Sequence, residues 1–258
     1  MQVLTRPWGA MHCQVDGPAD GIAVVFANSL GTDLRLWDPV LPRLPGVRAI
    51  RFDKRGHGLS DLSGPHDIHD LAADAAALIE TFADGPVIFV GLSVGGAIGQ
   101  ALAATRPDLL RALVLSNTAP KMGTAEAWQA RIAAIRAGGL AAITDAVMER
   151  WFAPAFRATP EFALWRTMFL RCDPQGYIDT CGVLAGCDLT GSTAGLRLPV
   201  QVIAGGADGA SPPDLVRATA GLIAGARYDE IPGAGHLPCV ETPDAWAALV
   251  APFLQEHA

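Results

Sequence analysis

The sequence predicts one α/β domain, built on a mostly parallel sheet with helices on both faces and interrupted by an inserted helical cap. Three observations lead to this prediction. Short apolar runs rich in Val and Ile recur without alternation, as strands covered on both faces require. Strand and helix patterns alternate, which favours βαβ units. Between residues 121 and 196 the strand-like runs disappear, and they return afterwards.

The composition narrows the class of protein. Half of the 258 residues are hydrophobic and 17% are charged, which supplies a large buried core and argues against disorder. The formal net charge is −7 and no run of Lys and Arg occurs, so neither nucleic acid nor an acidic membrane surface is an expected partner. The total charge does not restrict the local charge of a pocket.

The first residues and the cysteines bear on location. The chain does not begin with a basic segment followed by an apolar one, so no signal peptide is expected. The apolar run at 22–27 is far too short to span a bilayer. The five cysteines are odd in number and form no CxxC spacing. We therefore expect a reduced, cytoplasmic protein without a disulfide framework or a zinc site.

The elements of the first half follow in a regular order. Two short segments around Val3 and Cys13, separated by Pro7 and Gly9, predict an antiparallel hairpin. The other elements expected in this half are strands at 22–27, 48–52, 86–90 and 112–115 and helices at 68–82 and 94–105.

The second half contains the interruption. From about Lys121 to Leu196, Ala-rich and Trp-bearing helical stretches are broken by three prolines. The sheet pattern then returns in segments at 200–204 and 228–231, followed by a last helix at 243–255. We therefore expect residues 1–120 and 197–258 to form the core domain, and residues 121–196 to form a helical cap inserted into it.

The clearest functional signal is the segment 91–96, which reads Gly-Leu-Ser-Val-Gly-Gly. This is a G-x-S-x-G motif between an apolar strand and a helical pattern, the context of a nucleophile on a sharp strand-to-helix turn. Glycines on both sides remove side chains that would collide in such a turn. The turn also places Ser93 at a helix N-terminus, where backbone N–H groups favour negative charge. We therefore predict Ser93 as the nucleophile.

Two residues after later strands fit the partners that a serine nucleophile needs. An imidazole must accept the hydroxyl proton, and a carboxylate must orient that imidazole. The expected order along the chain is serine, acid, histidine. Beyond the cap the histidines are His236, on a glycine-rich loop after a strand, and the penultimate His257. Asp208 follows a strand, whereas Asp188 lies on the cap side and Asp214 at an expected helix start. We predict His236 as general base and Asp208 as the orienting acid.

Acyl transfer also needs backbone donors for the negative charge on the carbonyl oxygen, and losing one donor costs about 3 kcal/mol. One donor should be the N–H of Val94, which follows the nucleophile. The other should come from the loop after the strand at 22–27, which reads Asn-Ser-Leu-Gly. We choose the N–H of Leu30, because Gly31 allows the backbone to turn close to a substrate.

With these residues placed, the chain resembles the α/β-hydrolase superfamily over essentially its full length. Residues 53–60, Asp-Lys-Arg-Gly-His-Gly-Leu-Ser, resemble that family's D-x-R-G-x-G-x-S stretch. The role implied for this stretch is a tight structural turn, so no chemistry is assigned to Arg55 or His57.

The resemblance narrows further to 3-oxoadipate enol-lactonases. It depends on three segments: the loop 28–32, the cap segment Glu149–Phe152 with Pro154, and the cap segment 176–189. The last resembles a motif that in this family usually reads like G-Y-x-x-C-C-x-x-I-R-D-x-D-L. Gly176, Tyr177, Cys181, Asp188 and Leu189 match it, whereas Thr180 stands for the first cysteine and Ala185-Gly186 replaces the Arg-Asp pair. These departures bear on the substrate and leave the three predicted catalytic residues untouched.

The resemblance implies hydrolysis of a small anionic enol-lactone through an acyl-enzyme, a step of aromatic catabolism in the β-ketoadipate pathway. Ser93 would attack the lactone carbonyl and expel an enolate, and water activated by His236 would release the acyl group. No metal or organic cofactor is required. Because this lactone carries a free carboxylate, we expect a cation from the cap. Arg150 is the candidate, and Trp151 is the candidate pocket wall.

Other functions are compatible with the same motifs. A carboxylesterase, another lactonase or a carbon–carbon bond hydrolase would use the same residues, whereas a dehalogenase is disfavoured because it would be expected to have Asp in place of Ser93. A non-catalytic ligand receptor on this scaffold belongs to a different class, and it would give no burst of nitrophenol from an activated ester. The expected partner is a small-molecule lactone or ester, and the sequence carries no signal of an oligomeric state.

Overall fold

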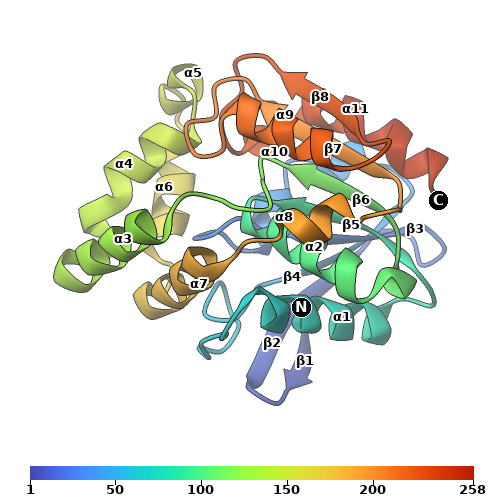
Figure 1. Cartoon of the computed structure of the whole chain (residues 1–258), viewed down its shortest axis with the longest axis horizontal. Coiled ribbons are helices and arrows are strands. Elements are labelled where there is room, and N and C mark those ends of the chain that lie inside the picture. Colours follow the sequence, from blue (N-terminus) through green and yellow to red (C-terminus); the bar gives the residue numbers. More distant parts are fainter.

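A single eight-stranded sheet runs through the computed structural model, which describes all residues from Met1 to Ala258 (Figure 1). Its strand order is β1-β2-β4-β3-β5-β6-β7-β8. The strands are β1 (Gln2–Arg6), β2 (Gly9–Asp16), β3 (Ile22–Ala27), β4 (Val47–Phe52), β5 (Val87–Leu92), β6 (Leu110–Ser116), β7 (Val200–Gly205) and β8 (Arg227–Ile231).

Strand direction separates the first two strands from the rest. β1 pairs with β2 in the predicted antiparallel hairpin, with Val3 opposite His12, and β2 pairs antiparallel with β4. All other neighbouring strands are parallel. Every residue of β5 and β7 is buried, which explains why these strands read as unbroken apolar runs. The predicted α/β class with a mostly parallel sheet is confirmed.

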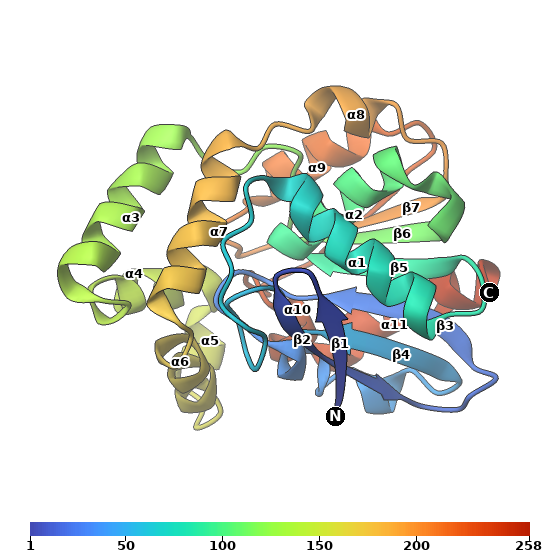
Figure 2. The same cartoon turned by 90° about the horizontal axis from the view of Figure 1, so that it is seen from below.

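Helices cover both faces of the sheet (Figure 2). Leu113 and Ser116 of β6 lie three residues apart and therefore point to opposite faces. Leu113 approaches Gly99 of one helix, whereas the Ser116 hydroxyl accepts a bond of 3.4 Å from the Trp246 indole of another. The helices of the predicted core are α1 (Ile68–Phe82), α2 (Val94–Thr105), α9 (Pro213–Leu222), α10 (Pro238–Glu241) and α11 (Pro243–Glu256), with short 3-10 turns at Leu34–Trp37, Leu41–Arg43 and Pro107–Leu109, and α8 (Thr190–Ala194) is the last helix of the predicted cap.

The segment between β6 and β7 contains helices only. They are α3 (Ala125–Gly138), α4 (Ala141–Trp151), α5 (Pro154–Arg157), α6 (Phe162–Leu170) and α7 (Pro174–Gly186), and they lie together beyond one end of the sheet (Figure 1). The next helix, α8, lies against the core instead, where the Thr193 hydroxyl donates to the Gln100 side chain at 2.8 Å. We propose that the cap spans residues 121–196. In this division α8 belongs to the cap and forms its contact with α2.

Three observations concern the chain as a whole. All five cysteines are free and buried. None of the helices combines the length and the apolar character that crossing a bilayer would require. No cluster of three or more His, Cys, Asp or Glu side chains is arranged to hold a metal ion.

Candidate active site

The carboxyl edge of the sheet brings the three predicted catalytic residues to one place. Ser93 follows β5, Asp208 follows β7 and His236 follows β8, each on the loop directly after its strand. Parallel strands end at the same edge, so these loops meet although the residues are up to 143 positions apart. All three side chains are buried, with exposed fractions of 8%, 4% and 2% respectively.

Ser93 lies in a strained turn between β5 and α2. Its backbone angles are φ 57° and ψ −118°, a region that residues with a side chain rarely adopt. The flanking glycines explain how the turn closes. A Cβ atom on Gly95 would overlap the carbonyl oxygen of Ala27, and one on Gly91 would overlap the carbonyl oxygen of Gly95. The turn therefore has the geometry expected of a G-x-S-x-G nucleophile.

Four hydrogen bonds hold the Asp208 carboxylate. Its Oδ1 accepts the backbone N–H groups of Ala210 at 2.7 Å and Ser211 at 2.9 Å. Its Oδ2 lies 2.8 Å from His236 Nδ1 and accepts the Asn117 amide at 2.9 Å. Because an ionised carboxylate only accepts, Nδ1 of His236 carries the hydrogen, which leaves Nε2 free to take a proton. Asp208 thus holds the histidine in the tautomer that a general base needs.

Asn117 was not identified from the sequence. It follows β6 directly and has a φ of 52°, and its amide also lies 3.3 Å from the carbonyl oxygen of Gly235. It therefore ties the loop of the acid to the loop of the histidine. Its position at a strand end was the available signal, because the same argument led to Asp208 and His236.

A cavity of about 120 Å³ contains both Ser93 and His236. The cap and the loop after β3 supply most of its other walls, which include Leu30, Trp128, Arg131, Arg150, Trp151 and Tyr177. The Trp151 ring is stacked beside the His236 ring, with centroids 6.2 Å apart and planes at 29°. Both cap residues predicted from the sequence, Arg150 and Trp151, line this cavity.

The end of α4 is hydrogen-bonded directly to the loops that carry Asp208 and His236. The Gly209 N–H donates to the carbonyl oxygen of Arg150 at 3.1 Å, and the His236 N–H donates to that of Trp151 at 2.7 Å. Gly209 is the residue after Asp208. These two bonds fix the backbone of this cap segment relative to the loops of Asp208 and His236. They therefore also fix where Arg150 and Trp151 lie relative to Ser93.

Glu241 also links the cap to the loop of His236. It was not identified from the sequence. Its Oε1 accepts the Gly235 N–H and its Oε2 accepts the Ala153 N–H, both at 2.9 Å. Burial raises the pKa of this carboxyl to about 7, although the two N–H donors and the nearby His236 favour the ionised form. One carboxyl group thus bridges the cap to the residue before His236.

Two arginines in the cavity have no carboxylate partner. Arg131 lies over the Trp128 ring at 4.7 Å and reaches the Tyr177 hydroxyl at 3.5 Å. The Nε atom of Arg150 is buried without a hydrogen-bond partner. Burial lowers the pKa of Arg150, and the charge of Arg131 lowers it further. The cavity therefore favours an anion. Nothing in the helical pattern of α3 distinguished Arg131 from solvated residues, so sequence reasoning did not find it.

The loop after β3 also lines this cavity. Leu30 lines the cavity, and its N–H makes no hydrogen bond within the protein. Val94, the other predicted donor, is the first residue of α2. Gly31 has a φ of 74°, and a Cβ atom there would lie 2.9 Å from the rings of Phe169 and Tyr177. The loop therefore turns tightly against the cap.

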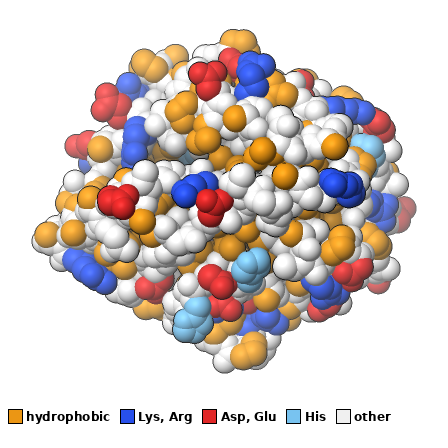
Figure 3. All heavy atoms as spheres, viewed as in Figure 1, with side chains coloured by type: hydrophobic (Ala, Val, Ile, Leu, Met, Phe, Trp, Pro, Cys, Tyr) orange, Lys and Arg blue, Asp and Glu red, His pale blue; other side chains and the backbone are white.

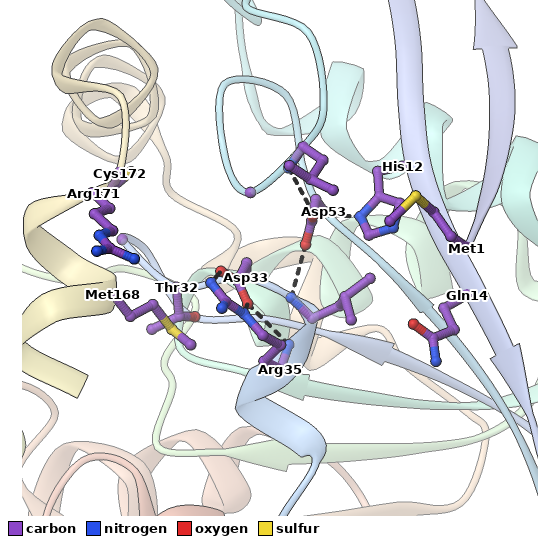
Figure 4. A pocket seen from close by; sticks show the side chains of 14 residues that line it. Met1, His12, Gln14, Thr32, Asp33, Arg35, Asp53, Met168, Arg171 and Cys172 are labelled. Atoms are coloured by element: carbon purple, nitrogen blue, oxygen red, sulfur yellow. Dashed lines mark hydrogen bonds and ion pairs between the residues drawn. The ribbon is translucent and has the colours of Figure 1, made fainter. Parts of the chain in front are cut away.

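A larger cavity of about 440 Å³ lies behind this loop and contains none of the predicted catalytic residues (Figure 4). Gly31, Thr32 and Asp33 line it from the loop, and Asp53 accepts a bond of 2.7 Å from the Leu34 N–H. The neighbouring Arg55 bonds Asp74 at 2.5 Å and lies over the Trp8 ring at 4.9 Å, away from Ser93. The smaller cavity is the candidate active site because it is lined by Ser93 and His236, the residues predicted as nucleophile and base.

This fold and this nucleophile turn define a class of protein, and comparison with known families agrees. The model of the alpha/beta hydrolase family matches residues 24–249, so the chain belongs to this family. Within the family it is similar to 3-oxoadipate enol-lactonases. It is 36% identical to 3-oxoadipate enol-lactonase 2 of Acinetobacter baylyi over 209 residues, which cover 80% of this chain and 78% of that protein.

Solved structures give the same result. The enol-lactonase from Burkholderia xenovorans LB400 is 36% identical and superposes with a TM-score of 0.94, covering 98% of this chain and 100% of that one. A thermophilic esterase from Thermogutta terrifontis is 27% identical, with a TM-score of 0.92 over the full length of both chains. The resemblance inferred from the sequence is confirmed, and the chain is a hydrolase-family protein with lactonase and esterase relatives.

Proposed function

We propose that this protein is a serine hydrolase that opens a small anionic enol-lactone, with 3-oxoadipate enol-lactone as the leading substrate. One observation carries the proposal. A single cavity contains Ser93, His236 and two guanidinium groups, those of Arg131 and Arg150, that have no carboxylate partner. The first pair fits acyl transfer, and the second pair fits a substrate carboxylate.

The arrangement of the core loops supports an acylation step of the following form. Ser93 Oγ attacks the lactone carbonyl while His236 Nε2 takes its proton, and Asp208 stabilises the resulting imidazolium. The N–H groups of Leu30 and Val94 stabilise the oxyanion. When the intermediate collapses, the ring C–O bond breaks and an enolate leaves. The enolate takes the proton from the imidazolium and becomes a ketone, so the proton balance closes with neutral His236.

Deacylation repeats the same steps with water. His236 takes a proton from a water molecule, and the oxygen of that water attacks the acyl carbon. The intermediate expels Ser93 Oγ, which regains its proton from the imidazolium. The product is a carboxylic acid, which loses its remaining proton to solvent and becomes a carboxylate, and each step uses only groups of this chain and water.

The cap cations supply the preference for an anionic substrate. Arg131 and Arg150 are half-buried, so a charge-assisted hydrogen bond from either one to a carboxylate is worth roughly 1.5–3 kcal/mol. That range corresponds to about tenfold to a hundredfold in kcat/KM. The similarity to enol-lactonases supports the lactone as the electrophile.

The proposal is tested by measuring hydrolysis across a panel of enol-lactones and neutral esters of similar size. We expect the anionic enol-lactone to have the highest kcat/KM, and we expect all turnover to disappear in Ser93→Ala. Efficient hydrolysis of neutral esters with no detectable turnover of the enol-lactone would contradict the proposed substrate. That result would indicate that Thr180 and Ala185-Gly186, where this chain differs from the enol-lactonase motif, accompany a change of substrate specificity.

A carboxylesterase is the second candidate, and the likeness to the Thermogutta terrifontis esterase favours it. The same panel separates it from a lactonase. A receptor that does not turn over its ligand would give no Ser93-dependent burst of nitrophenol from an activated ester. The proposal also includes a cytoplasmic location, supported by five free cysteines, and a place in the β-ketoadipate pathway, which the names of the enol-lactonase relatives suggest.

A further inference from the structure

A buried lysine lies directly behind the loop that carries Leu30. Lys54 follows β4 and is 2% exposed. Its Nζ atom donates to the backbone carbonyl oxygen of Ser29 at 2.6 Å and lies 3.3 Å from that of Thr32. It forms no salt bridge with any carboxylate. Burying an ammonium group costs desolvation free energy unless hydrogen bonds offset it. The two bonds to this loop are the contacts that stabilise Lys54 in its buried position.

The Ser29 carbonyl oxygen accepts hydrogen bonds from three donors. Besides the Lys54 ammonium, it accepts the Thr32 hydroxyl at 2.9 Å and the Thr32 N–H at 3.3 Å. The peptide group between Ser29 and Leu30 therefore cannot rotate without breaking all three bonds. Of the three donors, only the ammonium carries a full charge.

The same peptide group contains the N–H of Leu30. The chain has no cis peptide bonds, and in a trans peptide the carbonyl oxygen and the amide hydrogen point in opposite directions. Because Lys54 holds the oxygen from behind the loop, the Leu30 N–H is directed away from the lysine. Leu30 lines the cavity that contains Ser93, and its N–H has no partner in the protein.

We propose that Lys54 is a positioning residue for the oxyanion hole, which orients the Leu30 N–H toward the substrate and makes it a stronger donor. The proposal rests on the proposed serine hydrolase function. A cation on the carbonyl oxygen draws electron density from the amide, and linked hydrogen bonds strengthen one another. A donor held in place before the reaction also costs no reorganisation when the oxyanion forms.

The groups around Lys54 allow its protonation to be followed. Burial lowers the pKa of Lys54 to about 8, and Asp53 and Asp33 oppose this shift. Cys172 and His57 are the other ionisable groups near it. Burial raises the pKa of the Cys172 thiol to about 12 and holds the pKa of His57 well below its usual value. Both are therefore uncharged around pH 8, where Lys54 loses its charge. Figure 4 shows Thr32, Asp33, Asp53 and Cys172 around the cavity behind the loop.

The test compares Lys54→Met, which keeps the length and removes the charge, with Thr32→Val, which removes a neutral donor from the same oxygen. Because one complete oxyanion donor contributes about 10²–10³ in kcat, we expect Lys54→Met to lower kcat about tenfold to a hundredfold with KM changed less than about twofold. A trifluoromethyl ketone that mimics the oxyanion should lose affinity by the same factor as kcat/KM. Thr32→Val should change both less than about fivefold, in line with a neutral hydrogen bond.

The pH profile separates this role from a merely structural one. In the wild type, kcat for an activated ester should fall as pH rises through about 8, because the ammonium loses its charge. This alkaline decrease should be absent from Lys54→Met. Unchanged ketone affinity in Lys54→Met, or an identical alkaline decrease in the variant, would overturn the inference. If Lys54→Met does not fold, a wild-type kcat that stays constant through pH 9.5 overturns it equally.

The same measurements distinguish two failures. A wild-type enzyme without a Ser93-dependent burst of nitrophenol would refute the proposed function, and this inference with it. A normal burst together with a fully active Lys54→Met would refute the role of Lys54 alone.

Discussion

The core side and the cap side of the cavity differ in how their polar groups are satisfied. On the core side, Asp208 accepts four hydrogen bonds, one of which orients His236. On the cap side, Arg131 and Arg150 have no carboxylate partner. A buried network that is already complete fixes geometry, whereas a half-buried charge without a partner is stabilised by a ligand of opposite charge. The proposed chemistry therefore rests on the core side, and the proposed charge of the substrate rests on the cap side.

The largest effect is expected from the core side, at the nucleophile. Ser93→Ala should lower kcat by about 10⁶, because in a serine–histidine–acid site the nucleophile and base act as a unit. The assay is turnover of an activated ester by wild type and variant of matched purity, and the thermal midpoint shows that the variant is folded. Comparable turnover by the two proteins would remove Ser93 from the chemistry.

A second core variant tests the completed network. Asp208→Asn should lower kcat by about 10⁴, because an amide would face Nδ1 of His236 and favour the wrong tautomer. The control is Asp214→Asn, which changes an aspartate in the first turn of α9 and should leave kcat unchanged. Equal activity of the two variants would transfer the role of orienting acid to another residue.

On the cap side the effect should be smaller and should depend on the substrate. Arg150→Ala and Arg131→Ala should each lower kcat/KM for the anionic lactone about tenfold to a hundredfold, in proportion to one lost charge-assisted hydrogen bond. A neutral ester of similar size should be affected far less, and the exposed Arg136→Ala should affect neither substrate. An equal loss on both substrates would assign these arginines to cap packing.

The smallest effect concerns the junction between the two sides, and it is an effect on stability. The pKa of Glu241 is raised to about 7 in the folded protein from an ordinary value near 4.5. The folded state therefore binds this proton more tightly than the unfolded state, so the contribution of Glu241 to stability falls as pH rises from about 4.5 to about 7. Glu241→Gln should flatten the dependence of the thermal midpoint on pH in that range.

The control for this prediction is Glu161→Gln, an exposed position in the cap. Its thermal midpoint should follow the wild-type dependence on pH. The same slope in Glu241→Gln as in the wild type would show that the carboxyl between Ala153 and Gly235 titrates with an ordinary pKa.

Local patterns were predictable to within a residue or two. The helices expected at 68–82 and 94–105 have these bounds in the structure, and the strand expected at 200–204 is one residue longer. Asp208 and His236 were predicted as site residues for the same reason, because each lies one short loop after a recognisable strand. Arg131 and Glu241 were not found, because their partners lie on other elements, whereas Asn117 was missed although it too follows a strand.

What the sequence determined by itself is the strand-to-helix turn around Ser93 and the sheet that carries it. Gly91 satisfies a local steric requirement, since the atom that a Cβ there would overlap, the carbonyl oxygen of Gly95, lies on the turn itself. Only the tertiary structure decided which charges meet at the cavity. Lys54 reaches Ser29 across 25 residues, and Glu241 reaches Ala153 across 88. Such contacts depend on how distant segments pack, and no periodicity along the chain encodes them.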